Sequence, residues 1–188
     1  MNTFINKISL IPGWYGTAIV LVYSILLAEY FSVINDLCTK DLLEVSSLTE
    51  IIMQISYGIS IFSSIAAWTI LCLMFHLVAL LFDGQQEFKK FLFTSSYLYI
   101  IPSIALIIAI NLLGTIELEN SKDMVSELMD NTKFNTVSDI VGYSFIPFYL
   151  LSSCIIRYQY KIKWLYSFLS VAIPVLTIWG LTELYKII

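Results

Sequence analysis

Charged side chains are scarce in this sequence. Lysine, arginine, aspartate and glutamate together make up 13% of the 188 residues, whereas hydrophobic residues make up 59%. A water-soluble globular domain ordinarily carries about 25% charged residues, because its surface faces water. The sequence therefore lacks the polar surface that a soluble globule or a soluble enzyme needs.

The residues and motifs of common catalytic sites are also missing. The sequence has one histidine, His76, and contains no HExxH motif, no GxSxG motif and no glycine-rich phosphate loop. No aspartate is expected inside the apolar segments described below, which argues against an intramembrane aspartyl protease. One histidine without clustered acids supplies little for general acid–base catalysis. We therefore predict that the protein is not an enzyme and uses no cofactor.

Cysteines and basic clusters are equally sparse. The three cysteines, Cys38, Cys72 and Cys154, are an odd and scattered set, which predicts neither a disulfide framework nor a metal site. The ten lysines and arginines form no basic patch with interleaved aromatic residues. This distribution excludes nucleic acid as the expected partner.

Long apolar runs are what the sequence has in abundance. A membrane-spanning helix needs roughly 20 mostly apolar residues, and in lipid a helix satisfies its own backbone hydrogen bonds. We predict an all-α, polytopic membrane protein, with the whole chain forming a single five-helix domain. The five predicted helices cover residues 14–33, 55–82, 91–113, 140–156 and 165–184.

Basic residues indicate the orientation of these helices. Five of the ten lie in two short connections, namely Lys89, Lys90, Arg157, Lys161 and Lys163. The positive-inside rule places such connections in the cytoplasm, so we expect the N-terminus inside and the C-terminus outside. The first helix is expected to remain uncleaved, because Glu29-Tyr30-Phe31 lacks the small residues of a signal-peptidase site.

Both predicted outer loops are acidic, and the longer one covers residues 114–139. Asp36 lies in the first of these loops and Asp139 at the end of the second. Within the second loop, Ser121 is a candidate cap for a short helix. Four apolar residues, Met124, Val125, Leu128 and Met129, would share one face of that helix. We expect this face to lie on the membrane or against the other helices.

Ionisable groups inside membrane segments are costly and are candidate functional residues. Glu29 lies near the outer end of the first predicted helix, Glu183 near that of the fifth, and His76 near the inner end of the second. Glu29 is a candidate to pair with Asn111 in a proton or cation site. The alternatives are contact with interfacial water or a single interhelical hydrogen bond. His76 is interpreted as an interfacial or packing residue.

Prolines interrupt three of the predicted helices. Pro102, Pro147 and Pro174 each remove a backbone donor, and a membrane helix tolerates the resulting kink. Tyr97 precedes Pro102 by five residues, and Tyr143 precedes Pro147 by four. The two segments echo one another, either as the remnant of an internal repeat or as ordinary usage at helix ends.

The stretch from residue 68 to 102, WTILCLMFHLVALLFDGQQEFKKFLFTSSYLYIIP, resembles the Yip family of five-helix membrane proteins, which interact with Rab-type GTPases. The resemblance rests on His76, Gly84, Phe88, Lys89, Tyr97 or Tyr99, and Pro102. Family members often have two glycines where this chain has Asp83-Gly84. The resemblance implies a bacterial member, in a group of which some are associated with export transporters. Independently of the family, Gly84 is expected to supply the turn and Lys89 to contact anionic lipid headgroups.

Three functions remain open. The first is a non-enzymatic accessory or scaffold subunit of a membrane transport, export or trafficking complex. Its partner would be another membrane protein, either a transporter subunit or a second copy of this chain. The second is a transporter or channel for a small solute or ion. The third is an immunity or resistance protein against a membrane-active peptide. In each case the protein is expected in a lipid bilayer, most simply a bacterial cytoplasmic membrane.

Overall fold

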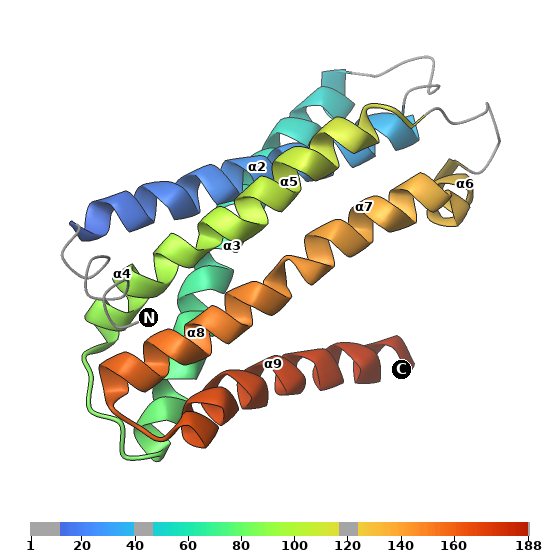
Figure 1. The fold of residues 1–188 in the computed structure, drawn as a ribbon. Coiled ribbons are helices and arrows are strands. Elements are labelled where there is room, and N and C mark those ends of the chain that lie inside the picture. The colour runs from blue at the N-terminus through green and yellow to red at the C-terminus, as the bar shows by residue number, and fades with distance from the viewer. Residues whose placement is uncertain (1–11, 40–46, 117–123, 188) are drawn as a thin grey trace. The chain divides into compact units, whose positions relative to one another are not determined.

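The structure is a computed structural model that describes residues 12–39, 47–116 and 124–187 (Figure 1). Over these residues every regular element is helical, which confirms the all-α fold class. The elements are α2 (Gly13–Thr39), α3 (Ser47–Leu81), α4 (Phe88–Ser96), η1 (Tyr97–Tyr99), α5 (Ile100–Leu113), α6 (Met124–Asp130), α7 (Thr132–Tyr143), α8 (Phe145–Tyr160) and α9 (Trp164–Ile187). Here η1 is a single 3₁₀ turn.

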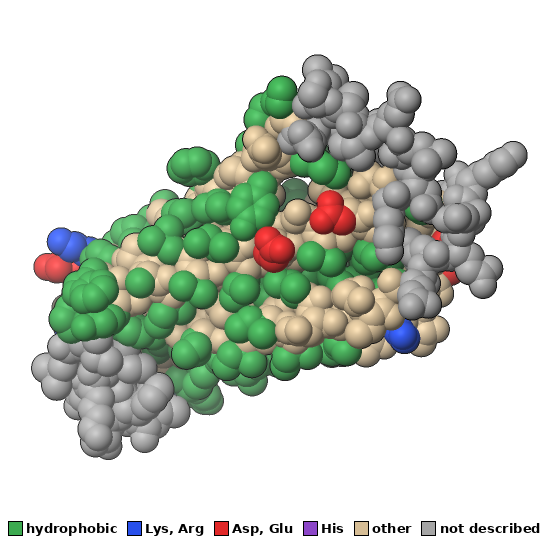
Figure 2. All heavy atoms as spheres, turned by 90° about the horizontal axis from the view of Figure 1, so that it is seen from above, with side chains coloured by type: hydrophobic (Ala, Val, Ile, Leu, Met, Phe, Trp, Pro, Cys, Tyr) green, Lys and Arg blue, Asp and Glu red, His purple; other side chains and the backbone are tan. Residues whose placement is uncertain are grey.

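Five helical segments are long and apolar enough to cross a membrane. They cover Gly13–Thr39, Ile51–Leu81, Phe88–Leu113, Thr132–Tyr160 and Trp164–Lys186. Many of their large apolar side chains point outward, including Phe62, Leu81 and Trp179. Figure 2 shows hydrophobic side chains along the helices in view, with few charged ones among them. Such a surface suits lipid rather than water, so the chain is a multi-pass membrane protein.

The first two helices are longer than the sequence predicts. Helix α2 continues to Thr39, and α3 already begins at Ser47. Asp36 therefore lies in the last turn of a helix rather than in a loop. The extension also moves Glu29 from near the outer end of the helix toward its middle.

The fourth span begins at Thr132 rather than at residue 140, because Asn131 caps it. The Asn131 side chain accepts hydrogen bonds from the backbone N–H groups of Lys133 at 2.9 Å and of Phe134 at 3.2 Å. Two of the unpaired donors at the helix start are thereby satisfied. Asp139 consequently lies inside α7, so the prediction that no aspartate lies in a spanning helix is wrong.

The predicted short helix before this span is confirmed as α6, whereas Ser121 lies outside the described residues. Its apolar residues do not share one environment. Leu128 is buried, whereas Val125 and Met129 are exposed. Leu128 is therefore the buried apolar residue of α6.

Two of the three prolines coincide with interruptions in the helices. Pro102 cannot donate to the carbonyl of Leu98, and the 3₁₀ turn η1 contains Leu98. Pro147 likewise leaves the carbonyl of Tyr143 without its donor, and α7 ends at Tyr143. Pro174, in contrast, lies inside an unbroken α9. The missing i→i−4 hydrogen bond explains both breaks.

The chain divides into two compact units. The first unit comprises Met1–Val20, Ala66–Tyr99 and Pro147–Ile188, and the second comprises Leu21–Ile65 and Ile100–Ile146. In the second unit α5 packs along α7, and Ser24 donates a 3.0 Å hydrogen bond to Ser64 between α2 and α3.

Glycines allow a close helix contact in the first unit. A Cβ atom on Gly16 would lie 2.0 Å from the Ser96 hydroxyl oxygen and 3.0 Å from the Phe93 carbonyl oxygen. A Cβ atom on Gly13 would lie 2.8 Å from the Phe93 ring. Small residues commonly permit such contacts between membrane helices, where van der Waals packing stabilises association. The start of α2 therefore lies directly against α4.

Candidate functional site

A buried histidine–tyrosine pair lies in the first unit, where α3 and α8 end. The Nδ1 atom of His76, near the end of α3, is hydrogen-bonded to the hydroxyl of Tyr160, the last residue of α8. The Phe88 ring centroid lies 5.3 Å from that of His76, and the Phe91 centroid lies 5.6 Å from that of Tyr160. A tyrosine hydroxyl both donates and accepts, so it satisfies either neutral histidine tautomer.

The turn after α3 holds the backbone close to this pair. The N–H of Asp83 donates to the carbonyl of Leu80, and the N–H of Gly84 donates to the carbonyl of Ala79, both at 3.1 Å. This is the Schellman pattern of helix termination, whose left-handed residue is usually glycine. Here that residue is Asp83, with φ of 60°.

Gly84 has a role different from the predicted one. No glycine among the described residues has a positive φ, so Gly84 does not supply the left-handed conformation of the turn. A Cβ atom at this position would instead lie 2.7 Å from the Ala79 carbonyl oxygen and 2.8 Å from the Tyr160 ring. Gly84 is therefore required by the close approach of Tyr160.

Replacing Asp83 by glycine is expected to stabilise the protein by about 1 kcal/mol. Glycine adopts a positive φ without a Cβ penalty, and the change removes a negative charge from a helix C-terminus. Thermal unfolding in detergent would show a raised midpoint. Asp83→Ala serves as the matched control, because it removes the charge and retains the Cβ atom. An equal gain in both variants would assign the effect to charge alone.

A second polar network joins α8 to the α4 segment. The Gln159 side-chain amide donates to the Thr94 hydroxyl at 2.8 Å, and Gln86 donates to the Gln159 carbonyl at 3.3 Å. On the neighbouring side of α4, Cys72 and Ser95 are hydrogen-bonded at 3.2 Å. The side-chain oxygen of Gln159 is buried and has no partner in the part of the chain that the structure describes. These bonds tie three segments of the first unit together.

The residues of the Yip-like motif have different environments. His76 and Gly84 contact Tyr160, and Phe88 packs on His76, so these three belong to one cluster. Lys89 is exposed. The remaining members lie apart from that cluster: Tyr97 donates to the Pro12 carbonyl at 3.0 Å, Tyr99 packs edge-on against Phe148, and Pro102 is buried in α5.

The other polar candidates are not brought together. Glu29 is exposed on α2, and the exposed Asn111 donates its amide to the carbonyl of Ile107 at 2.7 Å. No hydrogen bond within the described ranges joins Glu29 to Asn111. Glu183 forms an ion pair with Lys186 at 2.8 Å, one turn along α9.

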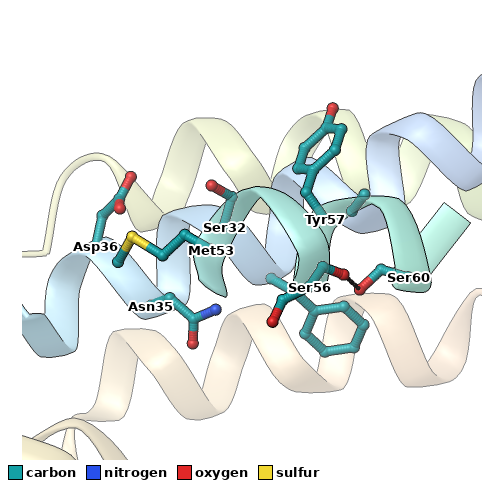
Figure 3. A pocket seen from close by; sticks show the side chains of 9 residues that line it. Ser32, Asn35, Asp36, Met53, Ser56, Tyr57 and Ser60 are labelled. Carbon is teal, nitrogen blue, oxygen red and sulfur yellow. Dashed lines mark hydrogen bonds between the residues drawn. The ribbon is translucent and has the colours of Figure 1, made fainter. Parts of the chain in front are cut away.

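A small pocket of mixed polar and apolar lining lies in the second unit, between the C-terminal part of α2 and α3 (Figure 3). Its volume is about 20 Å³. It is lined by Ala28, Phe31, Ser32, Asn35, Asp36, Met53, Ser56, Tyr57 and Ser60. The pocket is not evident from hydropathy, which predicts Asp36 in a loop and a second helix that begins only at residue 55. A serine every fourth position, at Ser56 and Ser60, is the signal that points to a polar face on α3.

The described residues offer no group of side chains suited to bind a metal ion such as zinc. Across residues 12–39, 47–116 and 124–187 no three histidine, cysteine or acidic side chains lie close enough to hold a metal ion together. The cysteines are free, and Cys72 is buried. A transition-metal or zinc site would need such a group.

Comparison with known proteins finds no match: no protein-family model, no curated protein and no solved structure is significantly similar to this chain.

Proposed function

We propose that this chain is a non-enzymatic accessory or scaffold subunit that binds another membrane protein of a transport, export or trafficking complex. The observation that carries the proposal is the exposed position of Glu29. This residue stands ten positions before Thr39, which corresponds to about 15 Å along the axis of α2. It is therefore well inside a segment able to span a membrane.

Toward the start of α2, the helix face that carries Glu29 is apolar, whereas Ser32 and Asp36 follow on the same face. Val22 and Ile25 lie on the same face of α2, seven and four residues earlier, and are 52% and 48% exposed. A charged side chain facing lipid near the centre of a span costs roughly 3 kcal/mol on insertion scales. Such residues ordinarily face a protein or a water-filled cavity. A polar group on a partner membrane segment would remove this cost.

The resemblance to the Yip family adds support. The resemblance selects His76, Gly84 and Phe88, and these residues lie in one cluster with Tyr160. A bacterial Yip-like protein would act as a non-enzymatic subunit in the cytoplasmic membrane. A direct interaction with a GTPase forms no part of the proposal.

Changing Glu29 to leucine is expected to release the partner. The wild-type protein, tagged and extracted in native lipid discs, should carry a membrane protein in fixed stoichiometry. Glu29→Leu should reduce the recovered partner at least fivefold, because a lipid-facing leucine offers no polar contact. Glu183→Gln is the matched control, since Glu183 is already paired with Lys186. Recovery of the wild-type chain alone would overturn the proposed function.

We further propose that the N-terminus is cytoplasmic and the C-terminus is outside. The exposed residues Lys89, Arg157 and Lys161 then lie on the cytoplasmic side, as the positive-inside rule favours. In a cysteine-free background, Lys89→Cys should resist a membrane-impermeant thiol reagent in intact cells, and Lys133→Cys should react. The reverse labelling pattern would invert the orientation.

The α2–α3 pocket favours a second candidate function, a transporter or channel for a small solute or ion. A transport pathway needs polar groups exposed within a span, and the pocket provides several. The observation concerns one small cavity rather than a continuous path, so the accessory role remains the primary proposal.

A further inference from the structure

The α2–α3 pocket contains polar side chains that make no hydrogen bond to any other residue that the structure describes. Most serines and threonines of the other helices donate to a carbonyl three or four residues earlier, as Ser152 and Thr177 do. Ser60 also does so, donating to the Ser56 carbonyl at 2.9 Å. Within the described chain, in contrast, the side chains of Ser32, Asn35 and Ser56 make no hydrogen bond, and the Asp36 carboxylate has no ion-pair partner.

Unused oxygen atoms of this kind have a physical consequence. A polar side chain in a membrane segment is costly unless it is hydrogen-bonded or hydrated. Figure 3 shows Ser32, Asn35 and Asp36 projecting from α2 beside Met53 and Ser56 of α3. The pocket therefore offers one carboxylate and several neutral oxygen atoms to a ligand that binds to oxygen.

Size and charge restrict the ligand. The pocket is partly open, since Asn35, Asp36 and Ser56 are exposed, and its volume of about 20 Å³ accommodates a body of roughly the size of one water molecule. Among the described residues of the lining Asp36 is the charged one, and it stands in the last turn of α2, where the helix dipole favours a cation. Calcium ordinarily takes six to eight oxygen ligands, with carboxylates prominent among them. One carboxylate with neutral oxygen atoms therefore suits a monovalent cation better than calcium.

We propose that this pocket binds one monovalent cation, either an alkali-metal ion or a small primary ammonium ion. The Asp36 carboxylate balances its charge, and oxygen atoms of Ser32, Asn35 and Ser56 replace part of its hydration shell. Phe31 and Met53 form the apolar part of the wall. The site does not depend on the accessory role, because all of its residues belong to this chain.

The test is a cation titration of the purified full-length protein in detergent. The background salt is N-methyl-D-glucamine chloride, whose cation is too large for the pocket, and ionic strength is kept constant. Sodium, potassium and methylammonium chloride are added in separate titrations, and tyrosine fluorescence and the thermal unfolding midpoint are followed. A saturable response to at least one of the three is expected. The identity of the effective salt distinguishes an alkali-metal ion from an ammonium ion.

Variants locate the response. Asp36→Asn should raise the dissociation constant at least tenfold, and Ser56→Ala should raise it severalfold. Asp139→Asn is the matched control, because Asp139 is an exposed aspartate of α7 outside the pocket lining, and its constant should equal that of the wild type. If Asp36→Asn fails to fold, the dissociation constant of Ser56→Ala alone tests the site. No saturable response, or an equal response in the pocket variants, overturns the site and leaves the partner experiment unaffected.

Discussion

Replacing Gly16 by valine is expected to destabilise the protein by about 3 kcal/mol. Any Cβ atom at this position meets the Ser96 hydroxyl oxygen at 2.0 Å and the Phe93 carbonyl oxygen at 3.0 Å. Rotating the hydroxyl away would break its 2.6 Å hydrogen bond to the Phe93 carbonyl, and the carbonyl itself is backbone. Helix α2 would therefore have to move away from α4. The midpoint of thermal unfolding in mild detergent measures the loss.

Gly58→Val is the matched control for this prediction. A Cβ atom on Gly58 of α3 would have no neighbour within 4 Å, so the same change in a helix should be nearly neutral. Combining Gly16→Ala with Ser96→Ala should restore part of the stability lost in Gly16→Ala, since the closest clashing atom is removed. Equal losses at Gly16 and Gly58 would show that the close contact at Gly16 is not responsible for the loss of stability.

Replacing Tyr160 by alanine is expected to cost roughly 4 kcal/mol. The ring is 2% exposed and fills the space between His76, Phe91 and Gly84, so its removal leaves a cavity at the end of the first unit. Tyr160→Phe keeps the ring and removes the hydroxyl that bonds to His76. It should cost about 2 kcal/mol, because the buried imidazole nitrogen loses its partner.

A double-mutant cycle isolates the hydrogen bond between the two side chains. His76→Phe and Tyr160→Phe, alone and together, should show a coupling of about 1 kcal/mol between the positions in unfolding experiments. Tyr185→Ala is the control, because Tyr185 is 84% exposed and its loss should change stability little. If the losses of stability from the two single changes are additive, the hydrogen bond between His76 and Tyr160 contributes nothing to the stability of this cluster.

The spanning helices were predictable because their signal is local. A run of about 20 apolar residues identifies a membrane helix without knowledge of any neighbour, and all five runs correspond to helices. Their ends were less predictable, since hydropathy falls before the helix ends. Asp36 lowers local hydropathy inside α2, and Asn131 caps α7 eight residues before residue 139, where the predicted loop ends. Capping and helix continuation depend on backbone hydrogen bonds that hydropathy does not report.

The residues around His76 were predictable only in part. The resemblance selected His76, Gly84 and Phe88, which are close in sequence. Tyr160 lies 84 residues from His76, and no local pattern links the two. Glu29 and Asn111 were paired by equal predicted depth, yet depth says nothing about which face of a helix a residue occupies. The Asn111 amide is bonded within its own helix.

The sequence by itself determined the class of this protein. Its shortage of charge and its apolar runs require lipid as the solvent. Continuous apolar runs of this length form helices in lipid, because a helix satisfies its backbone groups where no water is present. Only the tertiary structure decided which residues meet. It brought Tyr160 to His76 and Gly84, and it placed Asp36 in the lining of one pocket with polar residues of α2 and α3. Such contacts depend on the rotation of each helix about its axis, which the packing of side chains between helices decides and hydropathy does not.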